Sequence, residues 1–416
     1  MSVDLRIAVI SPFLDRRHGT ERVILEQIDR LLLHPHVQIH IYAEQLEDLP
    51  GAVPFDPSSA VDSRARLFWH KVPALPLPGP HLFAYLWWFF ANQFLRWRDA
   101  RYRGLTCDLV YSPGINAWDA DAIAIHIVFH EFYRRVASRL NFRGAPLVTW
   151  PRRLHRRLYY RLIMFLERRI YTRPRTRLAA VSGLVAGHMA EFFRRSDVLV
   201  IPNAVDIHRF TPEIRLQRRA AARAQMALAD GDFVLLLIGN DWEKKGLETL
   251  LHSIAECRDL PLKLLVAGKD DQNLFLPVIQ RLGLQGRVQF PGSSSDVVQF
   301  YAAADAYAGP SFEDSFALPP LEAMACGLPV ITSVNNGGAQ AITEAVDGFV
   351  LRDPRDSAAL ARLLRQLCEQ PDLRRRIGEN AARTAQAYTW ERNARETWAF
   401  LLSALERKRR QVPVQG

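Results

Sequence analysis

Short apolar runs alternate with amphipathic stretches along most of the chain, and the pattern occurs in two series. In the first series, buried strands are expected at 6–11, 37–43, 108–112, 122–126, 178–182 and 198–202, with helices at 19–33 and about 150–171. The second series begins after about residue 210, with strands expected at 233–239, 262–268, 287–292, 305–310 and 329–333 and a helix at 246–257. Short apolar strands between helices predict parallel sheets that are covered on both faces. We therefore expect an α/β fold with two Rossmann-like, doubly wound domains that face a cleft and join near 205–215.

The stretch Gly309–Ser333, GPSFEDSFALPPLEAMACGLPVITS, has the pattern of a loop, a short helix and a strand. Two consecutive prolines suit the first turn of the helix, and Gly327 is placed to end it. A helix N-terminus has free N–H groups that bind phosphate, and Glu322, further along the helix, can accept hydrogen bonds from ribose hydroxyls. The segment therefore indicates a pocket for a nucleoside diphosphate. A plain helix with two incidental acids, Asp314 and Glu322, would give the same pattern.

A second candidate lies in the sequence GNDWEKKG, directly after the expected strand at 233–239. Lys245 at this turn would neutralise the charge that develops on a departing diphosphate, and Lys244 stands beside it. The chain has only six lysines, so this adjacent pair favours a functional role over solvated loop charge. Gly268 and Lys269, which follow the next strand, could line the same nucleotide site.

Two further candidates belong to the first series. Gly19 lies between the first strand and the first helix, where a residue without Cβ lets the backbone approach a ligand closely. His126 ends the strand at 122–126, the position at which open α/β sheets place functional groups. His130 ranks second to it, and a single strand-end histidine can also be purely structural.

The triplet Asp119-Ala120-Asp121 resembles the DxD pattern with which some enzymes bind a divalent metal ion. The rest of the chain does not fit the fold that uses this motif, so a loop turn explains the triplet better. Because the lysine turn can supply the positive charge that a metal would bring, we expect metal-independent chemistry and no cofactor.

The stretch 309–333 also resembles the donor-site signature of retaining glycosyltransferases of family 4, PSxxEGFGLPxLEAMAxGxPV, in which two Glu residues lie eight positions apart. Glu322 matches the second Glu, Asp314 stands at the first, and Ala317 replaces the usual Gly. Two further motifs are similar, PNAVDIHRFTP at 202–212, with Ala204 in place of the usual Gly, and Lys245–Gly246. An Arg that often precedes this Lys is missing here.

The resemblance implies a GT-B fold with an acceptor-binding domain at 1–206 and a nucleotide-sugar domain at 207–388. The helix at 389–416 would then pack back on the first domain. A UDP- or GDP-sugar would be the donor, transferred with retention by front-face attack. The implied catalytic residues are His126, Lys245 and Asp314, and the implied donor-binding residues are Gly19, Lys244, Ser315, Phe316, Glu322 and Gly268.

Composition agrees with a globular protein, since 49% of the 416 residues are hydrophobic and 24% are charged. Four scattered cysteines lack metal-ligand spacing and indicate thiols in a reducing compartment. The N-terminus enters a strand directly and lacks the pattern of a signal peptide. A cytoplasmic location is therefore expected.

The net charge of +10 is concentrated in one segment, because the stretch 131–177 holds 14 Arg, no Lys and two Glu. Anionic lipid head groups, phosphate-bearing glycans and nucleic acid are candidate partners. The aromatic stretch LFAYLWWFFANQFL at 82–95 is too short to span a bilayer, and it predicts either a core helix or a helix at a membrane interface. A peripheral place on the inner face of the cytoplasmic membrane is expected, with the Arg-rich segment 134–177 on anionic lipid.

These observations predict a metal-independent, retaining glycosyltransferase that moves a sugar from a nucleotide sugar to a glycan or lipid-linked acceptor in cell-envelope polysaccharide or lipopolysaccharide synthesis. A sugar phosphorylase or synthase would share the architecture. A degenerate protein that binds nucleotide or glycan without transfer is also open, given Asp314, Ala317 and the missing Arg. A nucleic-acid binder is disfavoured, since no recognition motif accompanies the basic segment.

Overall fold

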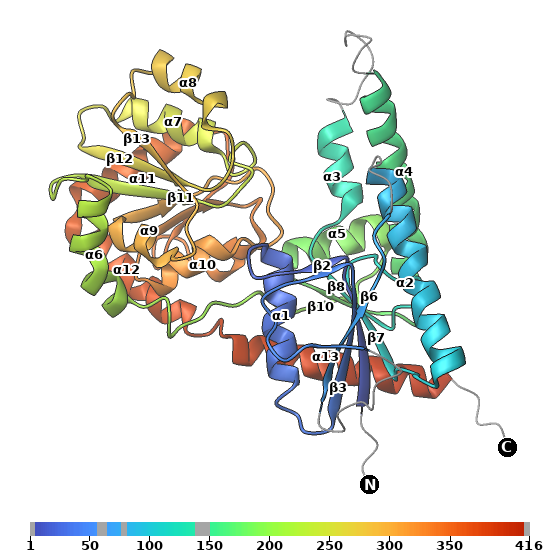
Figure 1. Cartoon of the computed structure of the whole chain (residues 1–416). Coiled ribbons are helices and arrows are strands. Elements are labelled where there is room, and N and C mark those ends of the chain that lie inside the picture. Colours follow the sequence, from blue (N-terminus) through green and yellow to red (C-terminus); the bar gives the residue numbers. More distant parts are fainter. Residues whose placement is uncertain (1–4, 56–64, 76–80, 138–149, 412–416) are drawn as a thin grey trace. The chain divides into compact units, whose positions relative to one another are not determined.

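Apolar residues at consecutive positions form the strands, because a parallel strand covered on both faces buries every side chain. The structure is a computed structural model that describes residues 5–55, 65–75, 81–137 and 150–411 (Figure 1). The chain forms two units. Unit 1 comprises Met1–Ile201 and Asn393–Gly416, and unit 2 comprises Pro202–Arg392.

The sheet of unit 1 is parallel, with the strand order β10-β9-β8-β7-β1-β3-β6-β5. From β1 the chain extends the sheet first through β3 and later, in the other direction, through β7. In open α/β sheets, ligands bind beyond the carboxyl ends of the strands at such a reversal. The strands are β1 (Leu5–Ile10), β3 (Val37–Ala43), β5 (Val53–Pro54), β6 (Leu67–Lys71), β7 (Leu109–Pro113), β8 (Ala122–Ile125), β9 (Arg177–Ala180) and β10 (Leu199–Val200), beside a separate pair of β2 (Phe13–Leu14) and β4 (Gln45–Leu46).

Successive side chains of a strand point to opposite faces of its sheet, so each strand of unit 1 contacts two helical layers. In β3, Ile39 and Ile41 belong to the apolar cluster formed with α1 and α13, whereas the Tyr42 hydroxyl donates to Asp99 of α2. The helices of this unit are α1 (Gly19–Leu31), α2 (His81–Arg103), α3 (Phe129–Val136), α4 (Trp150–Tyr171), α5 (Gly183–Phe193) and α13 (Trp390–Gln411).

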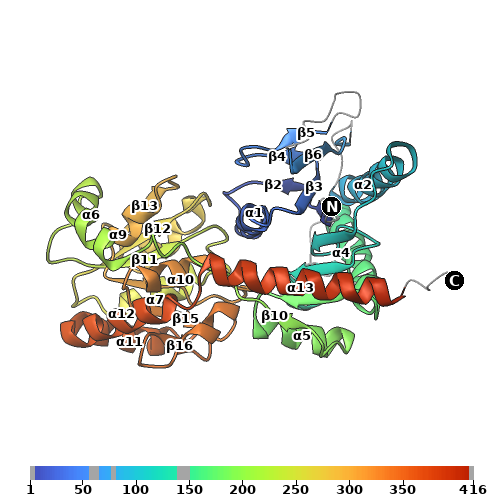
Figure 2. The same ribbon diagram turned by 90° about the horizontal axis from the view of Figure 1, so that it is seen from below.

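The last helix, α13, is held on unit 1 by both apolar and polar contacts. Phe400 and Leu401 are 1% exposed and pack in the same cluster as β1 and β3. The Gln27 side chain donates to Asn393 at 3.0 Å, and Lys408 lies 2.9 Å from the Asp121 carboxylate. Figure 2 shows α13 running along this unit.

The sheet of unit 2 is also parallel, with the order β13-β12-β11-β14-β15-β16 and a reversal between β11 and β14. Its strands are β11 (Phe233–Ile238), β12 (Leu262–Ala267), β13 (Val288–Gly292), β14 (Ala306–Ala308), β15 (Val330–Ser333) and β16 (Phe349–Leu351). Its helices are α6 (Pro212–Gln225), α7 (Leu247–Glu256), α8 (Leu276–Arg281), α9 (Val298–Ala303), α10 (Leu318–Ala325), α11 (Ser357–Glu369) and α12 (Pro371–Ala385), with 3-10 turns at Gln272–Leu274 and Gly337–Ala341.

The predicted α/β class with two parallel, Rossmann-like sheets is confirmed, and the expected strands agree with the observed ones to within about two residues at each end. In α10, the two prolines occupy the first turn, and Gly327 follows the helix with a φ of +72°. The strands β2, β4, β5, β6 and β16 were not predicted. The stretch 82–95 lies within α2, which buries one face and exposes the other, and its place at a membrane interface stays a prediction.

Candidate functional site

The turns that follow β11 and β14 are adjacent, at the reversal of the unit 2 sheet. Gly246 has a φ of +83°, and a Cβ at this position would lie 2.3 Å from the carbonyl oxygen of Pro310. The Phe312 N–H donates to the carbonyl of Lys244 at 2.7 Å, which joins the two turns through their backbones. The lysine turn and the acidic loop, which are about 70 residues apart in the sequence, therefore form one site.

Lys245 and Asp314 form an ion pair at the centre of this site. The Lys245 Nζ lies 3.1 Å from Asp314 Oδ2, and the two side chains are only 12% and 21% exposed. A Cβ on Gly239 would lie 2.6 Å from Cε of Lys245, and Gly239 has a φ of +124°, so the lysine side chain crosses the end of β11 at a position whose backbone favours glycine. Gly239 was not among the predicted residues, although a glycine directly after an apolar strand was a signal for it.

Lys244 takes a different direction from its neighbour. Its Nζ lies 3.3 Å from the Asp241 carboxylate, and its side chain is 42% exposed. The structure therefore brings Lys245, and not Lys244, to Asp314.

The loop that carries Asp314 is fixed by the turn after β15. The Asp314 N–H donates to the carbonyl of Asn335 at 3.0 Å, and the Asp314 carbonyl accepts from Gly337 at 2.8 Å. Buried Asn336 accepts from the N–H groups of Gly338 at 2.9 Å and Ala317 at 3.3 Å. Sequence reasoning missed Asn336, although an Asn-Asn-Gly-Gly run after an apolar strand is a clear turn signal.

Glu322 lies on α10 and is 5% exposed, with Oε2 accepting a hydrogen bond of 2.7 Å from the Tyr301 hydroxyl. Tyr307 lies near both predicted carboxylates: burial raises the pKa of its phenol well above 10, and the charges of Asp314 and Glu322 raise it further. Asp314 and Glu322 therefore both lie close to Tyr307, at the end of β14. The two tyrosines were not predicted, because a buried aromatic residue carries no sequence signal for a site.

The remaining predicted donor residues of unit 2 line the same loop and strand end. Ser315 is partly buried directly after Asp314, and Phe316 is 5% exposed, with its carbonyl accepting from Asn203 at 3.2 Å. A Cβ on Gly268 would lie 2.2 Å from the carbonyl oxygen of Gly239, so the turn after β12 approaches the turn after β11 as closely as glycine permits.

Unit 1 has a cavity of about 280 Å³ at the reversal of its own sheet. The turns after β1 and β7 contribute Ser11 and Gly114, and α2 and α4 contribute Tyr85 and Tyr159. His126 lines this cavity. The predicted Gly19 begins α1, whose next two residues, Thr20 and Glu21, line the cavity, and the space beside Gly19 is open.

His126 is the one predicted site residue that lines this cavity. Its Nε2 is buried and has no hydrogen-bond partner among the described residues. Burial lowers the pKa of His126 from 6.5 to about 4, because the charged imidazolium is poorly solvated there. At neutral pH the ring is therefore uncharged, with a polar atom that a ligand or water can satisfy.

This burial predicts a pH-dependent stability that His126→Gln removes. Between pH about 6.5 and 4, His126 is protonated in the unfolded chain but not in the folded one. As the pH falls through this range, the free energy of unfolding of wild type should therefore drop by up to about 1.4 kcal/mol per pH unit more than that of the variant. Urea unfolding of both proteins at pH 7 and pH 5 measures the difference. Equal losses on acidification would show that His126 titrates normally.

Two other candidates from the sequence have structural partners. His130 Nδ1 lies 2.7 Å from the buried carboxylate of Glu167. Asp119 pairs with Arg96 at 2.6 Å, whereas Asp121 accepts from the Val110 N–H and pairs with Lys408. Across the described parts of the chain, no group of three or more His, Cys, Asp or Glu side chains could hold a metal ion.

Residues 218–384, which include the lysine turn, the acidic loop and α10, match the family described as glycosyl transferases group 1. The matched stretch covers most of unit 2. The family resemblance drawn from the sequence is thus confirmed.

Curated relatives include D-inositol 3-phosphate glycosyltransferases. The one from Streptomyces avermitilis is 31% identical over 232 residues, which is 52% of this chain and 49% of the relative. The one from Actinosynnema mirum is 33% identical over 209 residues, 47% of this chain and 49% of the relative. The chain thus spans about half the length of the curated relatives it matches.

Solved structures resemble the chain over nearly its full length. WaaG, a glycosyltransferase involved in lipopolysaccharide biosynthesis, has a TM-score of 0.74 at 19% identity, covering 95% of this chain and 99% of WaaG. Sucrose-phosphate synthase from Thermosynechococcus elongatus has a TM-score of 0.72 at 20% identity, covering 96% and 98%. HepE of Anabaena, solved with UDP and glucose, has a TM-score of 0.67 at 18% identity, covering 96% and 100%. The fold is therefore that of GT-B glycosyltransferases.

Proposed function

We propose that this protein is a retaining glycosyltransferase that moves a sugar from a UDP- or GDP-sugar to a glycan or lipid-linked acceptor in cell-envelope polysaccharide or lipopolysaccharide synthesis. The observation that carries the proposal is the Lys245–Asp314 pair at the reversal of the unit 2 sheet, with Glu322 in the same neighbourhood. The names of the relatives and the UDP complex of HepE support the same chemistry.

In this proposal the C-terminal domain, 207–388, binds the donor, and the N-terminal domain, 1–206, binds the acceptor, with 389–416 packed back on the latter. Lys245 holds the diphosphate, with Lys244 and the N-terminus of α10 as further partners. Glu322 binds the ribose, while Asp314 and His126 orient the sugar, and Gly19, Gly268, Ser315 and Phe316 complete the donor site.

The transfer breaks the bond between the anomeric carbon and the diphosphate oxygen, and forms a bond from the same face to the acceptor oxygen. The acceptor proton passes to the leaving diphosphate, whose growing negative charge Lys245 stabilises. Since the lysine provides this positive charge, the proposed transfer needs no metal ion.

Thermal-shift measurements on a panel of nucleotide sugars test the proposal, because a ligand that binds the folded protein raises its melting temperature. We expect one UDP- or GDP-sugar to stabilise the protein and to yield nucleoside diphosphate when an acceptor is added. Binding without release would indicate the degenerate alternative, and phosphate-dependent release of sugar phosphate would indicate a phosphorylase. No response to any member of the panel would contradict the donor site.

The Arg-rich segment 134–177 is proposed to contact an anionic membrane, as a peripheral protein on the inner face of the cytoplasmic membrane. Arg139 and Arg143 of this segment lie outside the described residues. No helix in the described ranges is long and apolar enough to cross a bilayer.

A further inference from the structure

One face of α2 is an exposed stripe of aromatic side chains. Its members are spaced by four, three, four and three residues, which places them on one side of a helix. The opposite side is buried, with Trp88 and Phe89 only 2% and 4% exposed. The stripe consists of Phe83, Trp87, Phe90, Phe94 and Trp97, which are 56%, 40%, 64%, 61% and 53% exposed.

The neighbouring helix α4 carries a second set of exposed apolar residues. The rings of Tyr85 and Tyr159 meet edge to face, with their centroids 6.2 Å apart, where the two helices pack. On α4 the exposed set is Trp150, Leu154, Leu158 and Phe165, which are 42%, 51%, 47% and 52% exposed. We call these nine residues the apolar ridge.

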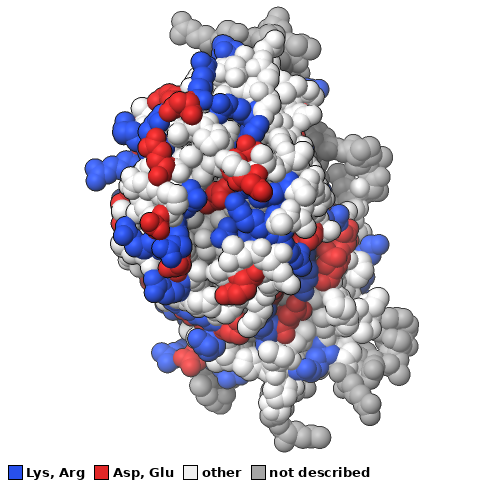
Figure 3. Space-filling view, turned by 90° about the vertical axis from the view of Figure 1, so that its left-hand side faces the viewer, with Lys and Arg blue, Asp and Glu red and all other residues white. Residues whose placement is uncertain are grey.

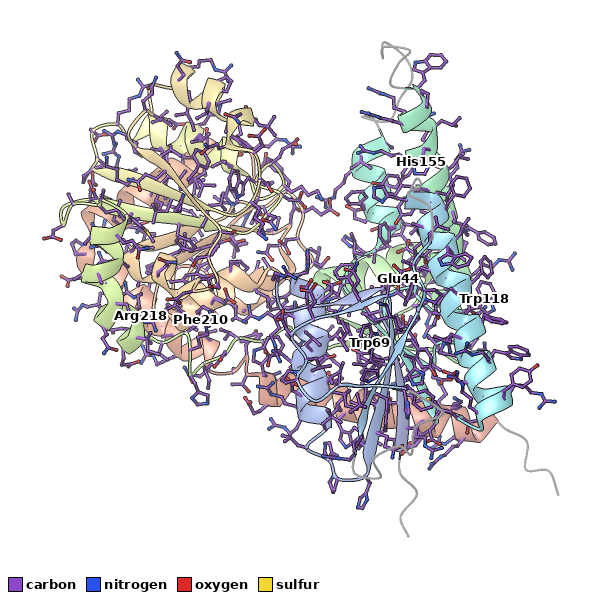
Figure 4. All side chains as sticks on the ribbon, in the orientation of Figure 1. Glu44, Trp69, Trp118, His155, Phe210 and Arg218 are labelled. Carbon is purple, nitrogen blue, oxygen red and sulfur yellow. The ribbon has the colours of Figure 1, made fainter. Side chains whose placement is uncertain are left out.

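Figures 1 and 4 show α2 and α4 side by side along one edge of unit 1, with side chains projecting outward. Trp118, labelled beside α2 in Figure 4, is 37% exposed. The Arg173 guanidinium lies 4.0 Å from the centre of its ring. An exposed apolar surface of this extent on a soluble protein ordinarily marks an interaction site.

The exposed charge on the two helices of the apolar ridge is basic, and the neighbouring acid Asp119, which is 51% exposed, pairs with Arg96 of α2. The only acids on the two helices are Asp99 and Glu167, and both side chains are fully buried and paired with histidines. The exposed charged residues of α4 are all arginines, namely Arg152, Arg156, Arg161, Arg168 and Arg169. By contrast, Figure 3 shows acidic and basic side chains interspersed on a face of unit 2, where Arg218 pairs with Asp296.

These observations favour one kind of partner. Tryptophan and arginine are typical of surfaces that lie in the head-group region of a bilayer, and a helix whose exposed charges are all arginines complements anionic lipid. A second copy of the chain on the same surface would bring like charges together. Leu154 and Leu158 give nucleic acid nothing to pair or stack with.

We propose that the apolar ridge inserts into the interface of an anionic membrane while the arginines of α4 bind its head groups. This adds an apolar contribution, from α2, to the electrostatic contact proposed for 134–177. Tyr85 and Tyr159, on the same two helices, line the His126 cavity. Resting here on the proposed function, we infer that the acceptor in this cavity is a glycan carried by a membrane lipid.

Sedimentation with vesicles of phosphatidylcholine, alone or mixed with phosphatidylglycerol, tests the ridge on the full chain. The variant Phe90→Ser/Phe94→Ser/Trp97→Ser should lose about tenfold or more in partitioning to mixed vesicles, because burial of apolar area drives insertion. Leu216→Ser/Leu274→Ser/Leu276→Ser is the matched control, since these residues of unit 2 are also exposed, at 59%, 71% and 44%, and should bind as wild type does. Arg161→Gln/Arg168→Gln/Arg169→Gln should remove the preference for anionic vesicles, because these arginines lie on the same side of α4 as its ridge residues.

Equal recovery of wild type and the aromatic variant with mixed vesicles would overturn the inference. So would self-association that the aromatic variant abolishes, or binding of wild type to an oligonucleotide but not to vesicles. The melting-temperature response to UDP and GDP, measured without vesicles, reports on the proposed function separately. A wild type that responds to nucleotide but ignores vesicles would refute the ridge alone, and one that binds vesicles but ignores nucleotide would refute the donor site alone.

Discussion

Replacing Lys245 by alanine is expected to lower kcat by about 10²–10³-fold while leaving the fold intact. The lysine is partly buried against Asp314 at the reversal of the unit 2 sheet, where water screens its charge poorly. In the proposed function its ammonium group stabilises the charge that develops on the leaving diphosphate. Release of nucleoside diphosphate in the presence of donor and acceptor measures the loss.

The control for this variant is Lys263→Ala, because Lys263 is an exposed lysine of the same unit that donates to the carbonyl of Gly286. It should retain full turnover. Lys244→Ala should lower kcat by less than Lys245→Ala does, because Lys244 lies at the same turn but pairs with Asp241. Unchanged kcat in Lys245→Ala, at a donor concentration that saturates it, would remove the diphosphate role.

Replacing Glu322 by alanine is expected to weaken donor binding by about 10–100-fold, the range for loss of charge-assisted hydrogen bonds. The effect should fall on the Kd of the donor and of the free nucleoside diphosphate alike, because the ribose is common to both. Titration calorimetry with the nucleotide that gives the largest thermal shift measures it.

The variant Tyr301→Phe tests the hydrogen bond that orients Glu322 separately from the Glu322 carboxylate itself. This variant removes the hydroxyl that donates to Glu322 at 2.7 Å but keeps the carboxylate in place. We expect a smaller loss of affinity, because Glu322 is still present though less firmly oriented. An unaltered donor Kd in Glu322→Ala, with the variant folded, would assign the ribose to another residue.

Local sequence pattern was sufficient for most elements of both sheets. The strand β3 and the helix α4 were predicted at their observed limits, 37–43 and 150–171, because apolar periodicity reflects burial directly. The strand β6 was missed since it lies in a stretch without flanking repeats of strand and helix. This strand pairs with β3, which is remote in sequence, so the local pattern does not show the pairing.

The sequence predicted which residues form the candidate site, but not which of their side chains are in contact. Lys245, Asp314 and Glu322 were named from the types of residue at turns and at a helix start. That Lys245 pairs with Asp314 while Lys244 turns to Asp241 could not be read from two adjacent lysines, because only the packing of one turn on another selects between them. Asn336, Tyr301 and Tyr307 act through contacts made after folding, and their identities alone do not indicate a site.

The sequence by itself determined the parallel α/β class, the family resemblance and the acids and lysines of the candidate site, because each depends on residue types at short, regular spacings. Only the tertiary structure decided which of these side chains meet, that His126 lines a cavity with an unpaired nitrogen, and that the aromatic face of α2 is exposed. Burial and pairing arise from segments remote in sequence. A single helix that is apolar on all sides has the same pattern whether its second face meets a core or a membrane.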